Sequence, residues 1–273
     1  MNTALPGWTG PAVVLALALL LVPEPTAAQG VRTPPVLERT TADPLANDVV
    51  DELFFGGRPS EAFQRLELRI ERDSADVEAR WRAARAALNL GILEDREEAE
   101  EQWFVVAGDH GEAAASLRPD DSEVLYWAAA SLGREALQHG PRTSTRLVQQ
   151  VWDLTHRVLE LDPDHPGAHN ILGKLNQEVM SLSGFERFLG RLLFSIDPLK
   201  EATWEAALDH HARAVEADPS TILFRRDYGE TLAALDRHDE ARAMWQAALA
   251  LPSVYPVDDR FKDDIRRMLA ELP

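Results

Sequence analysis

Apolar residues recur at helical spacing from about residue 44 to the end of the chain, in blocks separated by proline, glycine and aspartate. No segment shows sustained alternation of apolar and polar residues, so β-sheet is not expected. The pattern predicts helices over residues 44–55, 59–73, 76–90, 94–107, 120–139, 143–161, 166–182, 185–195, 199–217, 221–235, 238–250 and 257–271. We therefore expect an all-α fold of many short helices.

The later blocks repeat with a fixed period. Small or packed residues stand at the same offset in four pairs: Ala207 and Ala241, His211 and Trp245, Ala214 and Ala248, Val215 and Leu249. The offset is about 34 residues, the spacing of the tetratricopeptide repeat, a helical hairpin that buries its apolar face only by stacking on neighbours. The period predicts an α-α superhelix of such hairpins, which is usually a scaffold and rarely a catalyst.

One repeat is elongated. Asp162-Pro163 and Asp218-Pro219 are the same helix-stop signal, and a glycine follows each at the same distance, at Gly173 and Gly229. The two copies lie twenty-two positions farther apart than one repeat, so an insert of that length lies between Gly173 and Ala207. A glycine inside a helix costs about 1 kcal/mol relative to alanine, so each glycine predicts a close helix crossing.

The last two hairpins supply the expected structural core. Six residues fill the facing positions of the repeat: Ala207, Tyr228, Gly229, Ala241, Trp245 and Ala248. Farther upstream, Gly108 and Gly111 follow the acidic run 97–101, which is typical of a solvated helix face. Two glycines so close together are expected to end that helix and release a loop.

The insert carries an apolar helical stripe. Its members fall at i, i+3, i+4, i+7 and i+8: Phe185, Phe188, Leu189, Leu192 and Leu193. One interpretation is an extra helix that packs on the array. The other is a groove or lid that receives an apolar ligand or a partner helix. The candidate binding residues under the second interpretation are Phe185, Phe188, Leu192 and Trp204.

The N-terminal residues resemble a secretory signal. Residues 12–22 are an apolar run too short to span a bilayer, and Thr26, Ala27 and Ala28 match a cleavage site before Gln29. The first ten residues lack Lys and Arg, which departs from the usual pattern. We expect a signal peptide over 1–28, a flexible linker over 29–42 and the helical array over 43–273. The protein would be periplasmic or secreted, with membrane attachment only if the N-terminal segment stays uncleaved.

The charge balance restricts the partners. With 28 basic and 46 acidic residues the formal net charge is −18. Nucleic acid and anionic lipid are disfavoured, because both are bound through Lys and Arg. A basic peptide or protein fits better, although such a charge also serves solubility alone.

No motif for catalysis is visible. The chain has no cysteine, no nucleophile elbow, no phosphate-binding glycine loop and no zinc-protease motif. The closest approach to a metal site is the group Asp162, Asp164, His165, His169, His210 and His211. His165 precedes Pro166 at a helix start, and His211 takes the place of Trp245 in the repeat, so packed side chains are favoured over ligands. We expect no metal, no cofactor and no enzymatic activity.

Several segments resemble the regulator of microtubule dynamics family: residues 161–173, 182–194, 204–208, 239–242 and 247–252. The resemblance covers about residues 76–271 and implies a tetratricopeptide-like array with an elongated repeat at this place. Eukaryotic members are associated with microtubules and spindle poles, or with mitochondrial and endoplasmic reticulum membranes. Bacterial members look like exported proteins, and the signal-like segment favours that group, so microtubule binding is not carried over.

Two functions remain open at this stage. The favoured one is a non-catalytic scaffold that binds a protein or peptide in the concave groove. The alternative is a carrier or sensor of an apolar, lipid-like molecule, with the 185–199 helix as its lid. A groove lined by Asn, Arg and Glu would favour the first, and a dry apolar pocket beside 185–199 the second.

Overall fold

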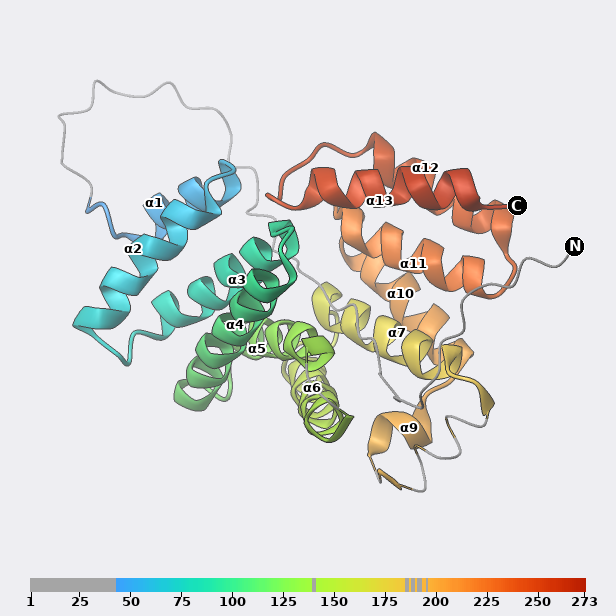
Figure 1. Cartoon of the computed structure of the whole chain (residues 1–273), viewed down its shortest axis with the longest axis horizontal. Helices are drawn as coiled ribbons and strands as arrows, with labels where there is room; N and C mark the ends of the chain where they lie inside the picture. The colour runs from blue at the N-terminus through green and yellow to red at the C-terminus, as the bar shows by residue number, and fades with distance from the viewer. Residues whose placement is uncertain (1–42, 139–140, 185–186, 188–189, 191–192, 195) are drawn as a thin grey trace, which may run out of the picture.

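The computed structural model describes residues 43–138, 141–184, 187, 190, 193–194 and 196–273. Within these residues the chain is helical and contains no strand, as the apolar pattern predicted. The helices (Figure 1) are α1 (Asn47–Phe55), α2 (Pro59–Arg72), α3 (Val77–Leu93), α4 (Glu97–Leu117), α5 (Ser122–Glu135), α6 (Pro141–Leu161), α7 (Pro166–Ser181), α9 (Asp197–Glu201), α10 (Trp204–Ala217), α11 (Ile222–Ala234), α12 (His238–Ala250) and α13 (Asp258–Glu271).

The helices form stacked hairpins. The hairpins are α1–α2, α3–α4, α5–α6, α7–α10 and α11–α12, and α13 closes the series. The first helices of successive hairpins, α3, α5, α7 and α11, lie next to one another, and α13 packs against α11 and α12. The predicted superhelix of helical hairpins is therefore confirmed. The elongated repeat is α7–α10, with the insert between its two helices.

Side-chain hydrogen bonds cap the N-termini of the first helices of several hairpins. Asp76 accepts a hydrogen bond from the backbone N–H of Ala79 at the start of α3 (2.9 Å), and Asp121 accepts one from the N–H of Glu123 in the first turn of α5. His165 is the N-cap of α7, where its Nδ1 accepts from the N–H of Ala168 (3.2 Å). Such caps satisfy backbone donors that the first helical turn leaves unpaired. His165 therefore stands just before the helix that Pro166 begins, as its place in the sequence indicated.

The two repeat glycines lie at close helix crossings, as predicted. A Cβ built on Gly173 would stand 2.7 Å from the imidazole ring of His211, and one on Gly229 would stand 2.2 Å from the indole Nε1 of Trp245. His211 is fully buried and packs where Trp245 packs in the next hairpin. Ala207, Gly229, Ala241, Trp245 and Ala248 are buried, whereas Tyr228 is only partly buried.

Two element predictions were wrong. The helix expected to end near residue 107 continues to Leu117, because Gly108 and Gly111 face α5 and do not break α4. A Cβ on Gly111 would lie 2.8 Å from the Cα of Ala128, so the glycine permits a close crossing. The helix expected over 199–217 is divided into α9 and α10. Thr203 causes the break, since its hydroxyl caps α10 and its N–H donates to Asn176 Oδ1 at 3.0 Å.

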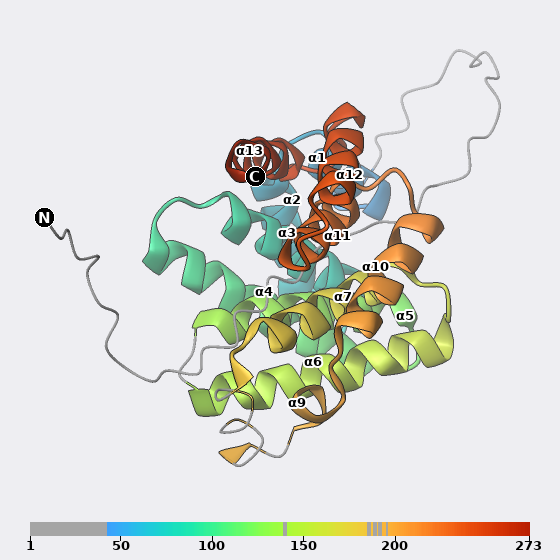
Figure 2. The same cartoon turned by 90° about the vertical axis from the view of Figure 1, so that its right-hand side faces the viewer.

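The two ends of the array touch. Tyr255, between α12 and α13, packs against Phe54 and Phe55 of α1 with ring centroids 6.3 and 5.6 Å apart. Arg260 at the start of α13 pairs with Asp95 in the turn before α4, with 3.1 Å between Nη1 and Oδ1. Figure 2 shows α13 end on. The array therefore curves until its last helix reaches its first hairpins, and the row of first helices lines the inside of the curve.

None of the helices in the described part of the chain combines the length and the apolar character needed to cross a bilayer. The expected signal peptide (1–28) and linker (29–42) lie outside the described residues.

Candidate partner-binding site

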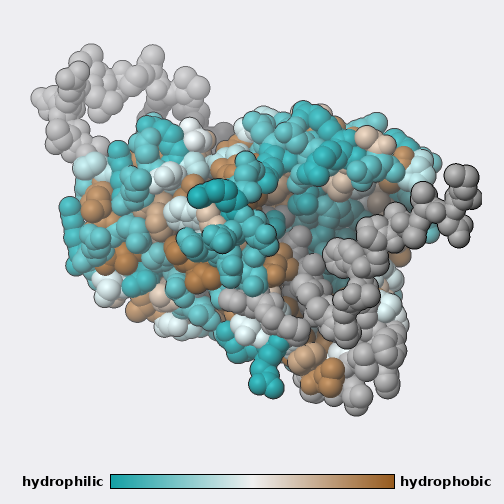
Figure 3. Space-filling model, in the orientation of Figure 1, coloured by the Kyte–Doolittle hydropathy of each residue, from teal (hydrophilic) through white to brown (hydrophobic). Residues whose placement is uncertain are grey.

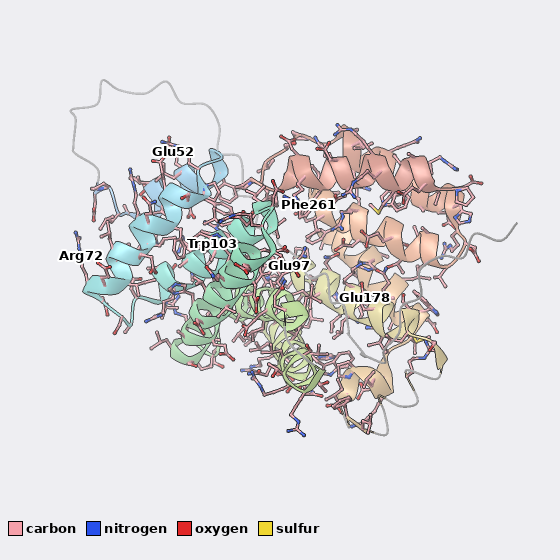
Figure 4. The ribbon with its side chains drawn as sticks, in the orientation of Figure 1. Glu52, Arg72, Glu97, Trp103, Glu178 and Phe261 are labelled. Carbon is pink, nitrogen blue, oxygen red and sulfur yellow. The ribbon has the colours of Figure 1, made fainter. Side chains whose placement is uncertain are left out.

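Charged side chains gather on the inside of the curve. They come from four helices and form what we call the inner cluster: Arg134 of α5, Lys174 and Glu178 of α7, Arg226, Asp227 and Glu230 of α11, and Asp264 of α13. Figure 4 labels two residues of this region, Glu178 on α7 and Phe261 on α13.

Lys174 links two hairpins. Its ammonium group contacts the Glu230 carboxylate of α11 and lies 3.2 Å from Glu178 Oε1, one turn along its own helix. The side chain is only 4% exposed. Burial alone would lower the pKa of Lys174, but Glu230 and Glu178 raise it above its usual value. Lys174 therefore stays charged in the folded protein.

Arg226 joins α11 to α13. Its guanidinium is 3.0 Å from Glu230 Oε1, 3.3 Å from Asp227 Oδ1 and 3.9 Å from Asp264 Oδ2. It also lies over the ring of Phe261, 5.3 Å from the centroid. Its Nε is buried without a hydrogen-bond partner among the described residues. Burial opposes the charge, but the three carboxylates raise the pKa of Arg226.

The carboxylates of α11 differ in pKa. Burial raises the pKa of the fully buried Asp227 to about 6, although Arg226 acts against this. Asp227 accepts a hydrogen bond from Asn170 Nδ2 at 2.9 Å. Burial would also raise the pKa of Glu230, but Arg226 and Lys174 lower it to about 2. Glu230 therefore stays ionised between the cations Arg226 and Lys174.

Arg134 brings α5 into the same region. Burial, and then the neighbouring Arg226, lowers the pKa of Arg134 to about 10, while Asp227, Glu100 and Glu230 oppose this change. The inner cluster holds three cations and four carboxylates, and Arg267, also on α13, pairs with one of these carboxylates, Asp264. The charges of this region are therefore nearly balanced.

The inner cluster was not predicted from the sequence, although a signal was present. Lys174 directly follows Gly173, and Glu230 directly follows Gly229. They therefore occupy equivalent positions on adjacent first helices and face each other. Lys174–Glu178 and Arg226–Glu230 are also i, i+4 pairs of opposite charge, a spacing that puts both members on one helix face.

The histidines are packed side chains. His169 Nε2 lies 2.9 Å from the carbonyl oxygen of Pro163, and its Nδ1 lies 3.0 Å from His210 Nδ1. His211 Nδ1 lies 3.2 Å from Asn170 Oδ1. Across the described residues, no three His, Cys, Asp or Glu side chains are placed to hold a metal ion. Each of these histidines is accounted for by packing or hydrogen bonds.

The insert is only partly described. Phe185, Phe188 and Leu192, three of its candidate binding residues, lie outside the described residues. Trp204, the fourth, is half-buried at the first position of α10. Leu199 is buried, and Phe194 and Ile196 pack against the core, whereas Leu193 of the predicted stripe is 65% exposed. The lid interpretation remains a prediction.

A curved stack of helical hairpins defines a tetratricopeptide-like array, a fold that commonly serves as a scaffold for protein interactions. The model of the family described as regulator of microtubule dynamics protein 1-3 matches residues 48–273, and the chain belongs to this family. The resemblance seen in the sequence is thereby confirmed.

Individual relatives agree with this family, and a solved structure agrees with the fold. Regulator of microtubule dynamics protein 3 of Rattus norvegicus is 28% identical over 190 residues, which are 69% of this chain and 40% of the relative. Protein 1 of Caenorhabditis elegans is 22% identical over 219 residues, 80% of this chain and 96% of that protein. The chain thus spans about 40% of the length of its mammalian protein 3 relatives. A tetratricopeptide protein of Thermus thermophilus superposes with a TM-score of 0.56 at 16% identity, covering 82% of this chain and 96% of the other.

Proposed function

We propose that this protein is a non-catalytic scaffold that holds a segment of a protein or peptide partner on the inside of its curve. The inner cluster is the observation that carries the proposal. Replacing a buried ion pair with well-packed apolar residues is often neutral or stabilising. Four helices nevertheless supply seven charged side chains here, which suggests a role in recognition as well as in packing.

The charges favour a basic partner segment. Glu230 and Glu178 are 16% and 19% exposed, so their carboxylates can meet a cation from outside, whereas Asp264 is already paired with Arg267. Arg226 and Lys174 hold them in place. Figure 3 shows that the visible face of the molecule is mostly hydrophilic, with apolar residues scattered over it. This distribution fits a polar contact surface better than a lipid-binding one.

The test separates recognition from stability. A photo-crosslinking amino acid replaces Glu178 at the inner cluster or, as a control, the exposed Gln246 on α12, in protein expressed in its native host. We expect covalent adducts with a protein from the first position and not from the second. The double variant Lys174→Met/Glu230→Met keeps the pair matched, so it should fold and lose the adduct. Equal adducts from both positions, or an unchanged adduct in the folded double variant, would contradict the proposal.

We also propose that the protein is exported, on the strength of the apolar run 12–22 and the small residues before Gln29. An exported partner would then meet it outside the cytoplasm. Mass-spectrometric reading of the N-terminus of the native protein tests this. A first residue near Gln29 is expected, and a chain that retains residues 1–28 in the membrane fraction would indicate an anchored protein.

A further inference from the structure

A recess lies between the outer helices of two hairpins. It has a volume of about 710 Å³ and lies between α4 and α6, with α5 beneath it. Leu125 and Leu132 of α5 form the floor, and Ala115 of α4 and Leu154 of α6 contribute to the walls. We call this recess the outer groove. It is separate from the inner cluster, which lies mainly on the first helices.

The helices on either side of the outer groove run parallel. One side is lined by Glu112, Ala115 and Ser116 of α4 and by Pro119 just beyond it, and the other by Gln150, Asp153, Leu154 and Arg157 of α6. Both sets follow i, i+3, i+4, i+7, so each covers about two helical turns on one face. At a rise of about 1.5 Å per residue the groove is about 10 Å long, the length of two turns of a bound helix.

Two polar bridges cross the groove. Gln150 Nε2 donates to Glu112 Oε1 at 3.1 Å near one end, and Arg157 Nη2 donates to Asp120 Oδ1 at 2.8 Å near the other. The first bridge connects α6 to α4, and the second connects α6 to the turn that follows α4. The apolar floor lies between the two bridges.

The rim has carboxylates without a matching cation. Glu112 accepts its hydrogen bond from the neutral amide of Gln150, and Asp153 accepts from the neutral amide of Gln149 at 2.8 Å. Both residues are exposed. Arg157, the cation among the described lining residues, is already shared between Asp120 and Glu160. An apolar floor flanked by two uncompensated carboxylates complements an apolar side chain flanked by cations.

We propose that the outer groove is a second docking site, which takes a short helical segment of another protein with one large apolar side chain flanked by Lys or Arg. The apolar side chain would lie on Leu125 and Leu132, and the cations would meet Glu112 and Asp153. This site does not depend on the inner cluster, so a scaffold with both could hold two partner segments at once.

The probe is a short alanine-based helical peptide with one leucine at its centre and a lysine one turn to either side. We expect NMR shift changes confined to residues 112–120, 125–132 and 150–157. Binding should weaken at least about tenfold when the leucine of the peptide becomes alanine. The same loss is expected when Glu112→Lys and Asp153→Lys are combined in the protein. A tenfold loss corresponds to about 1.4 kcal/mol of binding free energy. Ser116→Trp should block the groove, and Ser60→Trp on α2 is the matched control, because both serines are exposed.

Three results would overturn the proposal. The first is no shift change at millimolar peptide with the wild-type protein. The second is binding that does not respond to loss of the leucine, which would indicate charge attraction alone. The third is concentration-dependent dimerisation that Ser116→Trp abolishes, which would make the occupant a second copy of this chain. Circular dichroism of each variant confirms that the helices are intact.

Discussion

At the scale of single residues, glycine decides how close two helices of a hairpin come. His211 packs on Gly173 and Trp245 packs on Gly229, so the same ring-on-glycine contact is made in both hairpins, once with an imidazole and once with an indole. More residues separate Gly173 from His211 in the sequence than separate Gly229 from Trp245, and the difference equals the length of the insert. Trp245 Nε1 also donates to the carbonyl oxygen of Arg226 at 3.0 Å, which fixes the indole on α11.

A substitution next to this contact tests the register of the repeat. Ala241 is fully buried, so Ala241→Arg would force a long cation into the crossing of α11 and α12. We expect a loss of at least about 3 kcal/mol in the free energy of unfolding. Urea unfolding measures it, and Ala243→Arg at an exposed position of the same helix is the control. A midpoint that barely moves for Ala241→Arg would refute the register.

At the scale of elements, the repeat period predicted the hairpins and most helix positions. Periodicity could not predict the continuity of α4, because a glycine that breaks a helix and a glycine that admits a neighbour look alike in sequence. Only the close contact with Ala128 of α5 shows that Gly111 admits a neighbouring helix and does not end its own. The inner cluster was missed for a related reason. Lys174 and Glu230 belong to different hairpins, and their pairing follows from how the hairpins stack.

The role of Gly111 leads to a prediction at this scale. Alanine normally stabilises a helix relative to glycine by about 1 kcal/mol. At Gly111, however, the added methyl would meet the backbone of α5 at 2.8 Å, so Gly111→Ala should destabilise by about 1–3 kcal/mol. Gly184→Ala is the control, since its methyl would meet nothing within 4 Å. A thermal midpoint that rises in Gly111→Ala would show that α4 and α5 are not in close contact there.

At the scale of the whole molecule, buried histidines set the response to acid. Burial, and then Lys174, lowers the pKa of His211 to about 3, and burial, and then His169, lowers that of His210 to about 4. Unfolded histidines take up a proton near pH 6.5. The unfolded chain therefore binds more protons between pH 6.5 and 4, and stability falls as the pH falls through this window. Asp227, with its raised pKa of about 6, opposes part of this loss.

This balance predicts a pH profile. The urea midpoint should decrease between pH 7 and pH 4.5, because four histidines have lowered pKa values and three carboxyl groups have raised ones. The histidines are His110, His169, His210 and His211, and the carboxyl groups are Glu178, Asp227 and Asp258. His211→Phe keeps a ring on Gly173, but it removes a group that binds a proton in the unfolded chain and not in the folded one. The slope of unfolding free energy with pH should then shrink by up to about 1.4 kcal/mol per pH unit. The exposed His156→Gln is the control, and an unchanged slope in His211→Phe would contradict the assignment.

The closure between the two ends is the other property of the whole molecule. Tyr255 is 8% exposed and packs on Phe54 and Phe55 of α1. Removing a buried aromatic side chain usually costs about 3–5 kcal/mol, so Tyr255→Ala should destabilise the fold by about 3 kcal/mol. The Arg260–Asp95 pair spans the same junction, but Asp95 is 88% exposed, and such surface pairs contribute less than about 1 kcal/mol. Arg260→Ala is therefore expected to have little effect.

Stability alone does not show that the ends separate, so distance is the decisive measurement. Fluorescent labels on the exposed Glu52 of α1 and Asp259 of α13 report the span of the junction through energy transfer. In Tyr255→Ala, held well below its thermal midpoint, we expect lower transfer efficiency than in the parent protein and in Arg260→Ala. The reason is that the ring of Tyr255 joins the loop between α12 and α13 to the first hairpin. Unchanged transfer in a folded Tyr255→Ala protein would mean that the stacking of the hairpins, and not this contact, sets the curvature of the array.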